Sequence, residues 1–284
     1  MTEYIKSAHA KINLSLDVLS RRPDGYHEVS MVMHQVELAD TVKLVKKDVK
    51  LINLTSNSAQ IPLDERNIAY KAAELLFDRF NLDCGFDIYI EKNIPIAGGM
   101  AGGSTDAAAV LCLINDACSL NLSKEQLMKI GLELGADVPY CIFSKPALAE
   151  GIGEKISEIS GLPSCKILLV NPGVEVSTKE VYETIDSYQN DERVDNKSLI
   201  SCLSDKNLPG AVSYMKNVMQ PVSSKMCPQI TDIIEKIRSL GAIHAMMSGS
   251  GATCFGIFDK NADLSDAEQF FLGCSVNVTQ PYIG

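Results

Sequence analysis

Apolar and polar residues alternate near the start of the chain, over residues 11–18. A period of two places successive side chains on opposite faces of a β-strand, so this pattern predicts a strand. One face would carry Ile12, Leu14, Leu16 and Val18, and the other would carry Lys11, Asn13, Ser15 and Asp17. We therefore expect Lys11 and Asn13 to point to the same side.

The rest of the chain mixes strand and helix patterns without a regular order. Segments typical of strands are predicted at 28–38, 41–46, 49–55, 86–91, 165–170, 242–247 and 253–258. Helical spacing is predicted over 67–80 and beyond about residue 196, and Ser123 and Ser177 begin capping-box patterns. Strands and helices that do not alternate regularly favour an α+β fold. We expect two domains, 1–160 and 161–284.

Composition and charge narrow the class of protein. The chain has 284 residues and a net charge of -10. Binding to nucleic acid or to acidic membranes relies on clusters of Lys and Arg, which this chain does not show. No apolar run approaches the roughly 18 residues of a membrane span, and the start lacks a signal-peptide core. Nine cysteines without a Cys-x-x-Cys pair indicate buried free thiols. We expect a cytoplasmic protein with no nucleic-acid or membrane partner.

A glycine-rich segment joins the strand predicted at 86–91 to an alanine-rich helix. Its residues are Pro95, Ile96, Ala97, Gly98, Gly99, Met100, Ala101, Gly102, Gly103, Ser104 and Thr105. Glycine lets backbone amides approach an anion, and a helix start adds unpaired N–H groups and its dipole. The segment is expected to cradle phosphate. The alternative is a flexible turn capped by Ser104.

Three common nucleotide-binding classes are not supported by this segment. A P-loop would need Gly-Lys-Ser/Thr after the glycines, and a dinucleotide-binding fold would need Gly-x-Gly-x-x-Gly. The His-Arg-Asp and Asp-Phe-Gly motifs of protein kinases are not found either. A phosphate cradle of another kind is therefore expected.

The order Pro-x-x-x-Gly-x-x-Gly-Gly-Ser-Ser/Thr-Asp-Ala-Ala resembles the ATP loop of the GHMP kinase superfamily, which includes galactokinase, homoserine kinase and mevalonate kinase. Further matching segments, in the same order as in that superfamily, are AKINLSLDVLSRRPDGYHEV (10–29), LGADVPYCIF (134–143), NPGVEVST (171–178) and MSGSGATCFGIF (247–258). The resemblance implies a two-domain GHMP kinase fold. Its N-terminal ATP-binding domain would be ribosomal-protein-S5-like, and its C-terminal domain would be a ferredoxin-like α/β sandwich.

The resemblance also implies the phosphoryl donor and its site. ATP would lie with its phosphates across residues 95–105, and Asn67 would lie near the adenine. Mg²⁺ would bridge the phosphates, and Ser104 is the expected protein ligand because Mg²⁺ usually takes few of them. Residues 249–252 would supply backbone donors near the substrate, although a plain hairpin turn also accounts for them.

Phosphoryl transfer to an alcohol needs a group that accepts the hydroxyl proton and cations that offset the phosphoryl charge. Asp137, in a Gly-Ala-Asp-Val-Pro turn, suits the first role, and the resemblance implies that it is the catalytic base. Lys11 would keep Asp137 ionised and reach the γ-phosphate. Without the resemblance, Asp137 would be an ordinary turn or cap residue and Lys11 a solvated strand residue.

Three of the matching segments resemble one branch of the superfamily. That branch phosphorylates the 2-hydroxyl of a cytidine-diphosphate methylerythritol in the non-mevalonate route to isoprenoids. An aromatic sandwich with one hydrogen-bonding group is a reasonable way to select cytosine. The substrate-binding residues that the resemblance implies are Asn13, Tyr26, His27, Thr178 and Tyr182. Taken alone, Tyr26 and His27 would be a packed tyrosine and a surface histidine.

Some positions depart from the family pattern. Gly98, Met100, Ala101 and Thr105 stand where Ala, Leu, Gly and Ser are common, and no acidic pair follows Asn217. The four loop residues keep the size or hydroxyl character of the common ones.

Three alternatives stay open: a homoserine- or mevalonate-type kinase, a nucleotide-binding regulatory protein without catalysis, and a structural module. We expect a monomer or a weak homodimer.

Overall fold

The computed structural model describes residues 2–96, 98–186 and 193–283. Its residues form two compact units, each built from several stretches of chain. Unit 1 comprises Met1–Ala10, Ala39–Ile96 and Ala101–Ser144, and unit 2 comprises Lys11–Leu38, Ala97–Met100 and Lys145–Gly284. The chain therefore passes between the units repeatedly. The expected division at residue 160 stays a prediction.

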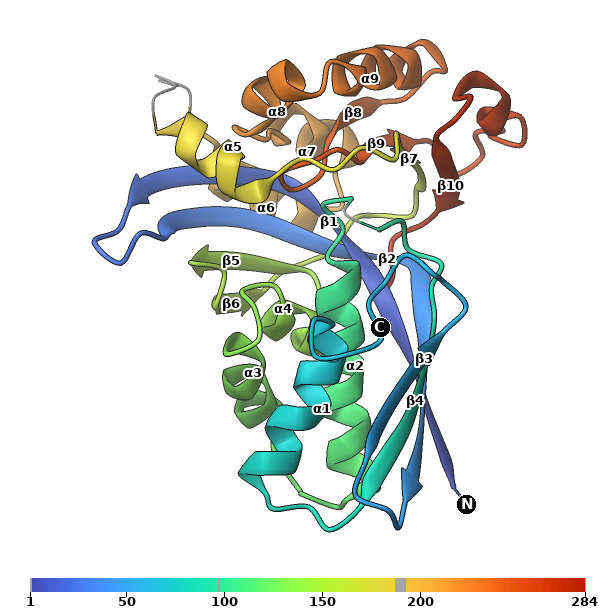
Figure 1. Cartoon of the computed structure of the whole chain (residues 1–284). Coiled ribbons are helices and arrows are strands. Elements are labelled where there is room, and N and C mark those ends of the chain that lie inside the picture. Colours follow the sequence, from blue (N-terminus) through green and yellow to red (C-terminus); the bar gives the residue numbers. More distant parts are fainter. Residues whose placement is uncertain (1, 97, 187–192, 284) are drawn as a thin grey trace. The chain divides into compact units, whose positions relative to one another are not determined.

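Unit 1 combines a sheet with helices (Figure 1). The long strands β1 (Glu3–Arg21) and β2 (His27–Lys47) contribute one part of their length to it. Its other elements are β3 (Ile52–Ser56), α1 (Ile68–Arg79), β4 (Gly85–Glu91), α2 (Gly102–Ala117), α3 (Lys124–Leu132) and α4 (Val138–Phe143). Strand β4 pairs antiparallel with β2 and parallel with β3, so it lies between them in the sheet.

The core of unit 1 lies between this sheet and the helices α1 and α2, which run side by side (Figure 1). Alternate residues of β4, namely Phe86, Ile88 and Ile90, are buried, as the period of a strand requires. Helix α1 turns its small residues Ala69 and Ala72 inward, which lets the helices approach closely. The packing of α2 places its first turn, and with it the end of the glycine segment, against this core.

Unit 2 contains a second, antiparallel sheet in the order β10-β7-β9-β8. Helix α9 packs on β8 and β9 through one stripe of isoleucines. The elements of unit 2 are the other parts of β1 and β2, β5 (Ala147–Gly151), β6 (Lys155–Glu158), β7 (Lys166–Asn171), α5 (Thr178–Ile185), α6 (Asn196–Ser204), α7 (Leu208–Tyr214), α8 (Gln220–Met226), α9 (Gln229–Ser239), β8 (His244–Met247), β9 (Cys254–Phe258), the short η1 (Ala267–Phe270) and β10 (Ser275–Thr279). Strand β5 pairs with both β2 and β6.

Most of the predicted elements are confirmed, with small shifts at their ends. The helix predicted at 67–80 is α1, and both hydrogen bonds of the capping box at Ser123 are present. The strands predicted at 28–38 and 41–46 are one continuous strand, β2. The polar residue Asp40 interrupts the apolar pattern between them, but it is fully buried and ion-paired, so the strand continues through it.

Over residues 10–17 both faces of β1 are buried, including the polar face that carries Lys11 and Asn13. Lys11 is 4% exposed, and Asn13 is fully buried. A lysine on a solvated strand face is therefore ruled out for Lys11. A buried polar face must be matched by hydrogen bonds, which makes it a candidate part of a site.

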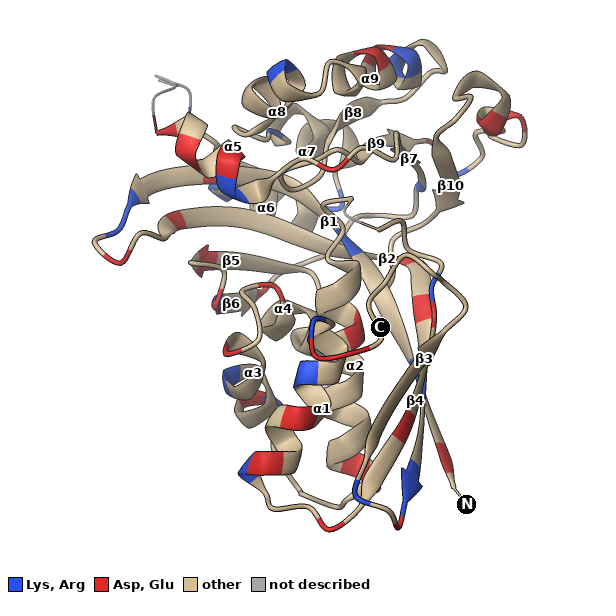
Figure 2. Cartoon of the chain, viewed as in Figure 1, with Lys and Arg blue, Asp and Glu red and all other residues tan. Residues whose placement is uncertain are grey.

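Acidic and basic residues are interspersed along both units (Figure 2). Helices α1 and α9 each carry charges of both signs. None of the helices described is long and apolar enough to span a lipid bilayer.

Candidate active site

The glycine segment ends in the first turn of α2, in unit 1. Helix α2 begins after the N-cap residue Ala101, and Thr105 N donates a hydrogen bond of 2.9 Å to Ala101 O. The first turn of a helix offers backbone N–H groups that have no intrahelical partner, and these bind anions. Ser104 lies inside this turn rather than at the N-cap, so a turn capped by Ser104 is ruled out.

The two hydroxyls in this turn have different environments. Thr105 is buried, and its Oγ1 donates a hydrogen bond of 3.0 Å to His9 O. Ser104 is only half-buried. Thr105 therefore anchors the helix, and Ser104 is the better candidate to face a ligand.

Ala101 has a left-handed backbone, with a φ of 58°. The family pattern has glycine here, and a residue with a Cβ is strained in this conformation. Replacing Ala101 by glycine is expected to raise the free energy of unfolding by about 1 kcal/mol, measured by urea denaturation. Asn81, with a φ of 46°, is the control: Asn81→Gly should gain less because asparagine tolerates this region. Equal gains for both variants would contradict the strain at Ala101.

The residues of the glycine segment that belong to unit 2 pack against a second glycine-rich segment, Ser248–Thr253. A Cβ on Gly99 would lie 2.5 Å from Ser248 O, and the φ of Gly99 is 71°. Ser248 Oγ donates a hydrogen bond of 3.2 Å to Gly99 O. This close backbone packing requires glycine at position 99. Ala97 lies outside the described residues, and Pro95 and Ile96 precede it in unit 1.

Lys11 and Asn13 lie beside these two segments in unit 2. Lys11 Nζ donates a hydrogen bond of 2.7 Å to Asn13 Oδ1, so the two side chains do point the same way. Lys11 Nζ is 3.5 Å from the place where a Cβ of Gly249 would lie, and Lys11 N donates to Met100 O. Asn13 N donates to Ser248 Oγ. A buried ammonium thus lies at a cradle of backbone groups.

One residue of helix α5 and one residue of the loop before α8 brace the second glycine-rich segment. Asn217 Nδ2 donates to Met247 O at 3.0 Å and to Gly249 O at 2.8 Å, a role that the sequence pattern did not indicate. Thr178 Oγ1 lies 2.8 Å from Ser250 Oγ. The segment joins the paired strands β8 and β9, so it is a hairpin connection that also forms a wall of the cradle.

The expected cytosine-binding residues lie partly together in unit 2. His27 stacks on Tyr182 with ring centroids 4.8 Å apart, and His27 Nε2 lies 2.7 Å from Asp186 Oδ1. Tyr26 is 59% exposed. A cavity of about 170 Å³ opens beside His27 and Asp186. His27 therefore lines a cavity while one face of its ring stacks on Tyr182, and the cytosine sandwich stays a prediction.

Asp137 and Asn67 hold N-cap positions in unit 1. Asp137 is half-buried and precedes α4, but within that fully described helix its side chain makes no capping hydrogen bond. Asn67 does cap α1, since its Oδ1 accepts from Ala69 N at 2.9 Å and its Nδ2 donates to Pro62 O. The catalytic role of Asp137 and a place for Asn67 near adenine both stay predictions.

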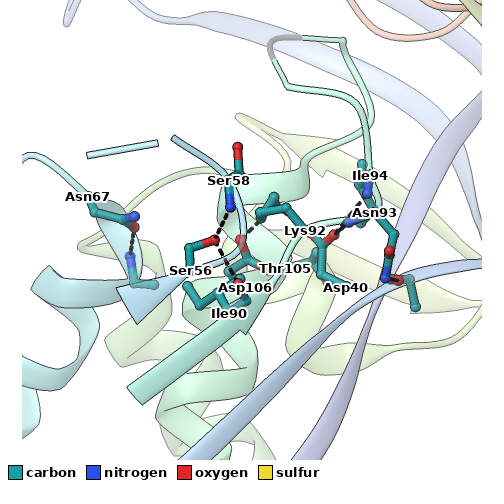
Figure 3. Close-up of polar contacts among 12 residues, drawn as sticks. Asp40, Ser56, Ser58, Asn67, Ile90, Lys92, Asn93, Ile94, Thr105 and Asp106 are labelled. Atoms are coloured by element: carbon teal, nitrogen blue, oxygen red, sulfur yellow. Dashed lines mark hydrogen bonds and ion pairs between the residues drawn. The ribbon is translucent and has the colours of Figure 1, made fainter. Parts of the chain in front are cut away.

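Sequence reasoning missed a buried charge network next to the glycine segment (Figure 3). Lys92 Nζ pairs with Asp40 and lies 2.8 Å from Asp106 Oδ2. Burial raises the pKa of Asp106 to about 7, against the opposing effect of Lys92. Burial alone would lower the pKa of Lys92, but Asp106 and Asp40 outweigh it and raise that pKa. Asp106 belongs to the loop pattern described above, but only the fold brings it next to Lys92 and Asp40.

Comparison with known proteins gives the family. The GHMP kinases N-terminal domain matches residues 67–145, and the GHMP kinases C-terminal domain matches residues 199–272. Among solved structures, a homoserine kinase from Cytophaga hutchinsonii shares the fold, with a TM-score of 0.77 at 17% identity over 100% of this chain and 95% of that one.

Three proteins with higher sequence identity to this chain are all named as the same kinase. The 4-diphosphocytidyl-2-C-methyl-D-erythritol kinase of Clostridioides difficile is 48% identical, covering 90% of this chain and 87% of that protein. Its counterpart in Caldicellulosiruptor bescii is 45% identical over 92% of each chain. A crystal structure of 4-(cytidine 5'-diphospho)-2C-methyl-D-erythritol kinase has a TM-score of 0.82 at 29% identity, covering 99% of this chain and 100% of that one. The chain belongs to the GHMP kinase family.

Proposed function

We propose that this protein transfers the γ-phosphoryl group of ATP to the 2-hydroxyl of 4-diphosphocytidyl-2-C-methyl-D-erythritol, giving the 2-phosphate and ADP in the non-mevalonate isoprenoid pathway. The family gives the reaction class, and the names of relatives that match most of the chain support this alcohol. The observation that carries the proposal is the buried Lys11 ammonium beside two packed glycine segments. A cation at a cradle of backbone groups is what a transferring phosphoryl group requires.

Asp137 acts as the base in this mechanism. The substrate oxygen attacks the γ-phosphorus while Asp137 takes the hydroxyl proton. The bond from the γ-phosphorus to its bridging oxygen breaks, and ADP leaves. Lys11 offsets the negative charge on the transferring group. Asp137 is half-buried and directly precedes α4, so its carboxylate is held at the start of that helix.

The phosphates of ATP lie along residues 95–105, where the first turn of α2 offers amide groups and the Ser104 hydroxyl. Mg²⁺ accompanies the ATP. Among the described residues no three His, Cys, Asp or Glu side chains gather as a metal site. Ser104 would be the protein ligand of the ion, because Mg²⁺ usually takes few protein ligands. When bound, the ion neutralises phosphate charge.

The cytidine end of the substrate binds to Tyr26, His27 and Tyr182, and Asn13 and Thr178 contact its other polar groups. Support comes from the stacking of His27 on Tyr182 and from the cavity that His27 lines. Aromatic faces bind a base by stacking, and the polar groups around them select it.

Replacing Tyr26 by alanine is expected to raise the KM for the cytidine substrate by about tenfold, because one stacking surface is lost. The KM for ATP should not change, and steady-state kinetics with each substrate varied in turn will measure both values. Tyr214→Ala, which removes another partly exposed tyrosine on α7, is the control and should change neither value. Equal increases for both substrates would show that the Tyr26 ring is structural.

The reaction is tested by ADP release from Mg-ATP with 4-diphosphocytidyl-2-C-methyl-D-erythritol, homoserine and mevalonate offered separately. Turnover with the cytidine compound alone is the expected result. Turnover with another alcohol would contradict the proposed cytosine-binding site but would still show that the protein is a small-molecule kinase. Binding of ATP without turnover would favour a regulatory nucleotide-binding protein.

We also propose that the protein works in the cytoplasm on small molecules alone, as a monomer or a weak homodimer. All nine cysteines are free thiols, which supports a reducing compartment. Size-exclusion chromatography with light scattering tests the assembly.

A further inference from the structure

The residues before the glycine segment are held by the buried carboxylate of Asp40 in unit 1 (Figure 3). Asp40 is fully buried, and its Oδ1 accepts hydrogen bonds from Asn93 N at 2.6 Å and Ile94 N at 2.8 Å. Its Oδ2 accepts from Lys92 Nζ. Asp40 therefore fixes the backbone that leaves β4 and enters the glycine segment.

The same ammonium reaches the other end of the glycine segment. Lys92 Nζ lies 2.8 Å from Asp106 Oδ2, one residue after the hydroxyl pair of α2. A Cβ on Gly102 would lie 3.4 Å from Lys92 Nζ and 3.3 Å from Ile94 Cγ2. The entry and the exit of the segment thus meet around Lys92.

Stability alone does not account for this arrangement. The side chains of Lys92, Asp40 and Asp106 are 6%, 0% and 4% exposed, and two carboxylates face one ammonium. Apolar residues of similar volume often replace buried ion pairs without loss of stability. Charge-assisted hydrogen bonds are directional, so each bond of this network fixes the position of one backbone or side-chain group at an end of the glycine segment.

We propose that Lys92 is a positioning residue for ATP: with Asp40 and Asp106 it clamps the two ends of the glycine segment, so that the amides of the first turn of α2 are already placed for the phosphates. The clamp acts through the loop and not by contact with the nucleotide. The proposal rests on the proposed function only in taking ATP as the ligand of this loop. It makes no use of the identity of the alcohol.

The test compares variants by titration calorimetry with ATP, without alcohol, at a temperature where circular dichroism shows each variant to be folded. Asp106→Ala removes the acceptor at the exit and should weaken ATP binding about tenfold, whereas Asp106→Asn keeps an oxygen acceptor and should stay within about threefold of the wild type. Lys92→Met removes both links and should weaken ATP binding by more than Asp106→Ala does. Arg79→Met, which breaks the exposed Arg79–Glu133 pair of the same unit, is the control and should leave ATP binding unchanged.

The readout separates positioning from stability, because a purely structural network would change the melting temperature and not the affinity of the folded protein. Wild-type affinity in folded Asp106→Ala, or equal losses in the alanine and asparagine variants, would overturn the proposal. If Lys92→Met does not fold, the comparison of Asp106→Ala with Asp106→Asn still tests the proposal. A wild type that binds ATP but phosphorylates none of the alcohols would refute the proposed function and leave this comparison valid.

Discussion

Replacing Asp137 by asparagine is expected to lower kcat by about a hundredfold or more and to leave the KM for ATP unchanged. Asparagine has nearly the same shape as aspartate but cannot accept the proton of the substrate hydroxyl. The N-cap of α4 should not be affected, because the Asp137 side chain makes no capping bond within that helix. Pre-steady-state and steady-state ADP release, with urea denaturation of both proteins, measure these effects.

An N-cap aspartate elsewhere provides the control for Asp137. Asp195 precedes α6 and accepts a hydrogen bond of 3.0 Å from Ser198 N, so it does cap its helix. Asp195→Ala should lower the free energy of unfolding by about 1 kcal/mol and leave kcat unchanged. Unchanged turnover in Asp137→Asn would remove Asp137 from the role of base. A loss of stability equal to that of Asp195→Ala would make it a cap.

The elements that could be predicted from the sequence are those that local chemistry defines. The helix after Asn67 has a polar N-cap and an apolar stripe, and the capping box at Ser123 needs only neighbouring residues. The glycine segment is equally local, because its glycines and the helix that follows are adjacent in the chain. Such features need no knowledge of distant residues.

Features that depend on partners far away in the chain could not be predicted. Two strands were predicted on either side of Asp40, at 28–38 and 41–46, whereas β2 runs through it, and its partner Lys92 is known only from the fold. In the same way, the alternation at residues 11–18, taken alone, left a solvated strand face open as an alternative for Lys11, yet Lys11 and Asn13 are buried. A polar side chain in a strand pattern can therefore face solvent or lie buried with hydrogen-bond partners, and only tertiary packing decides between the two.

The contact between Gly99, in the unit 2 part of the glycine segment, and the second glycine-rich segment illustrates this dependence, and it leads to the second prediction with a large expected effect. Each segment could be read as a turn, but Gly99 has a Cα hydrogen where any side chain would press on Ser248 O. Replacing Gly99 by alanine is expected to cost about 2–4 kcal/mol of stability, because a left-handed backbone and a steric clash are combined. The KM for ATP should also rise about tenfold, because the loop must shift. Urea denaturation and steady-state kinetics measure the two effects.

Gly241→Ala separates backbone strain from the clash. Gly241 also has a left-handed backbone, with a φ of 89°, but a Cβ there would meet no atom within 4 Å. This variant should lose about 1–2 kcal/mol from strain alone and keep the wild-type KM for ATP. If the Gly99 variant loses no more stability than the Gly241 variant and binds ATP normally, the close packing of the two segments does not position the phosphate cradle. A larger loss confined to the Gly99 variant would show that contact between the two segments, and not the flexibility of glycine, holds the cradle in shape.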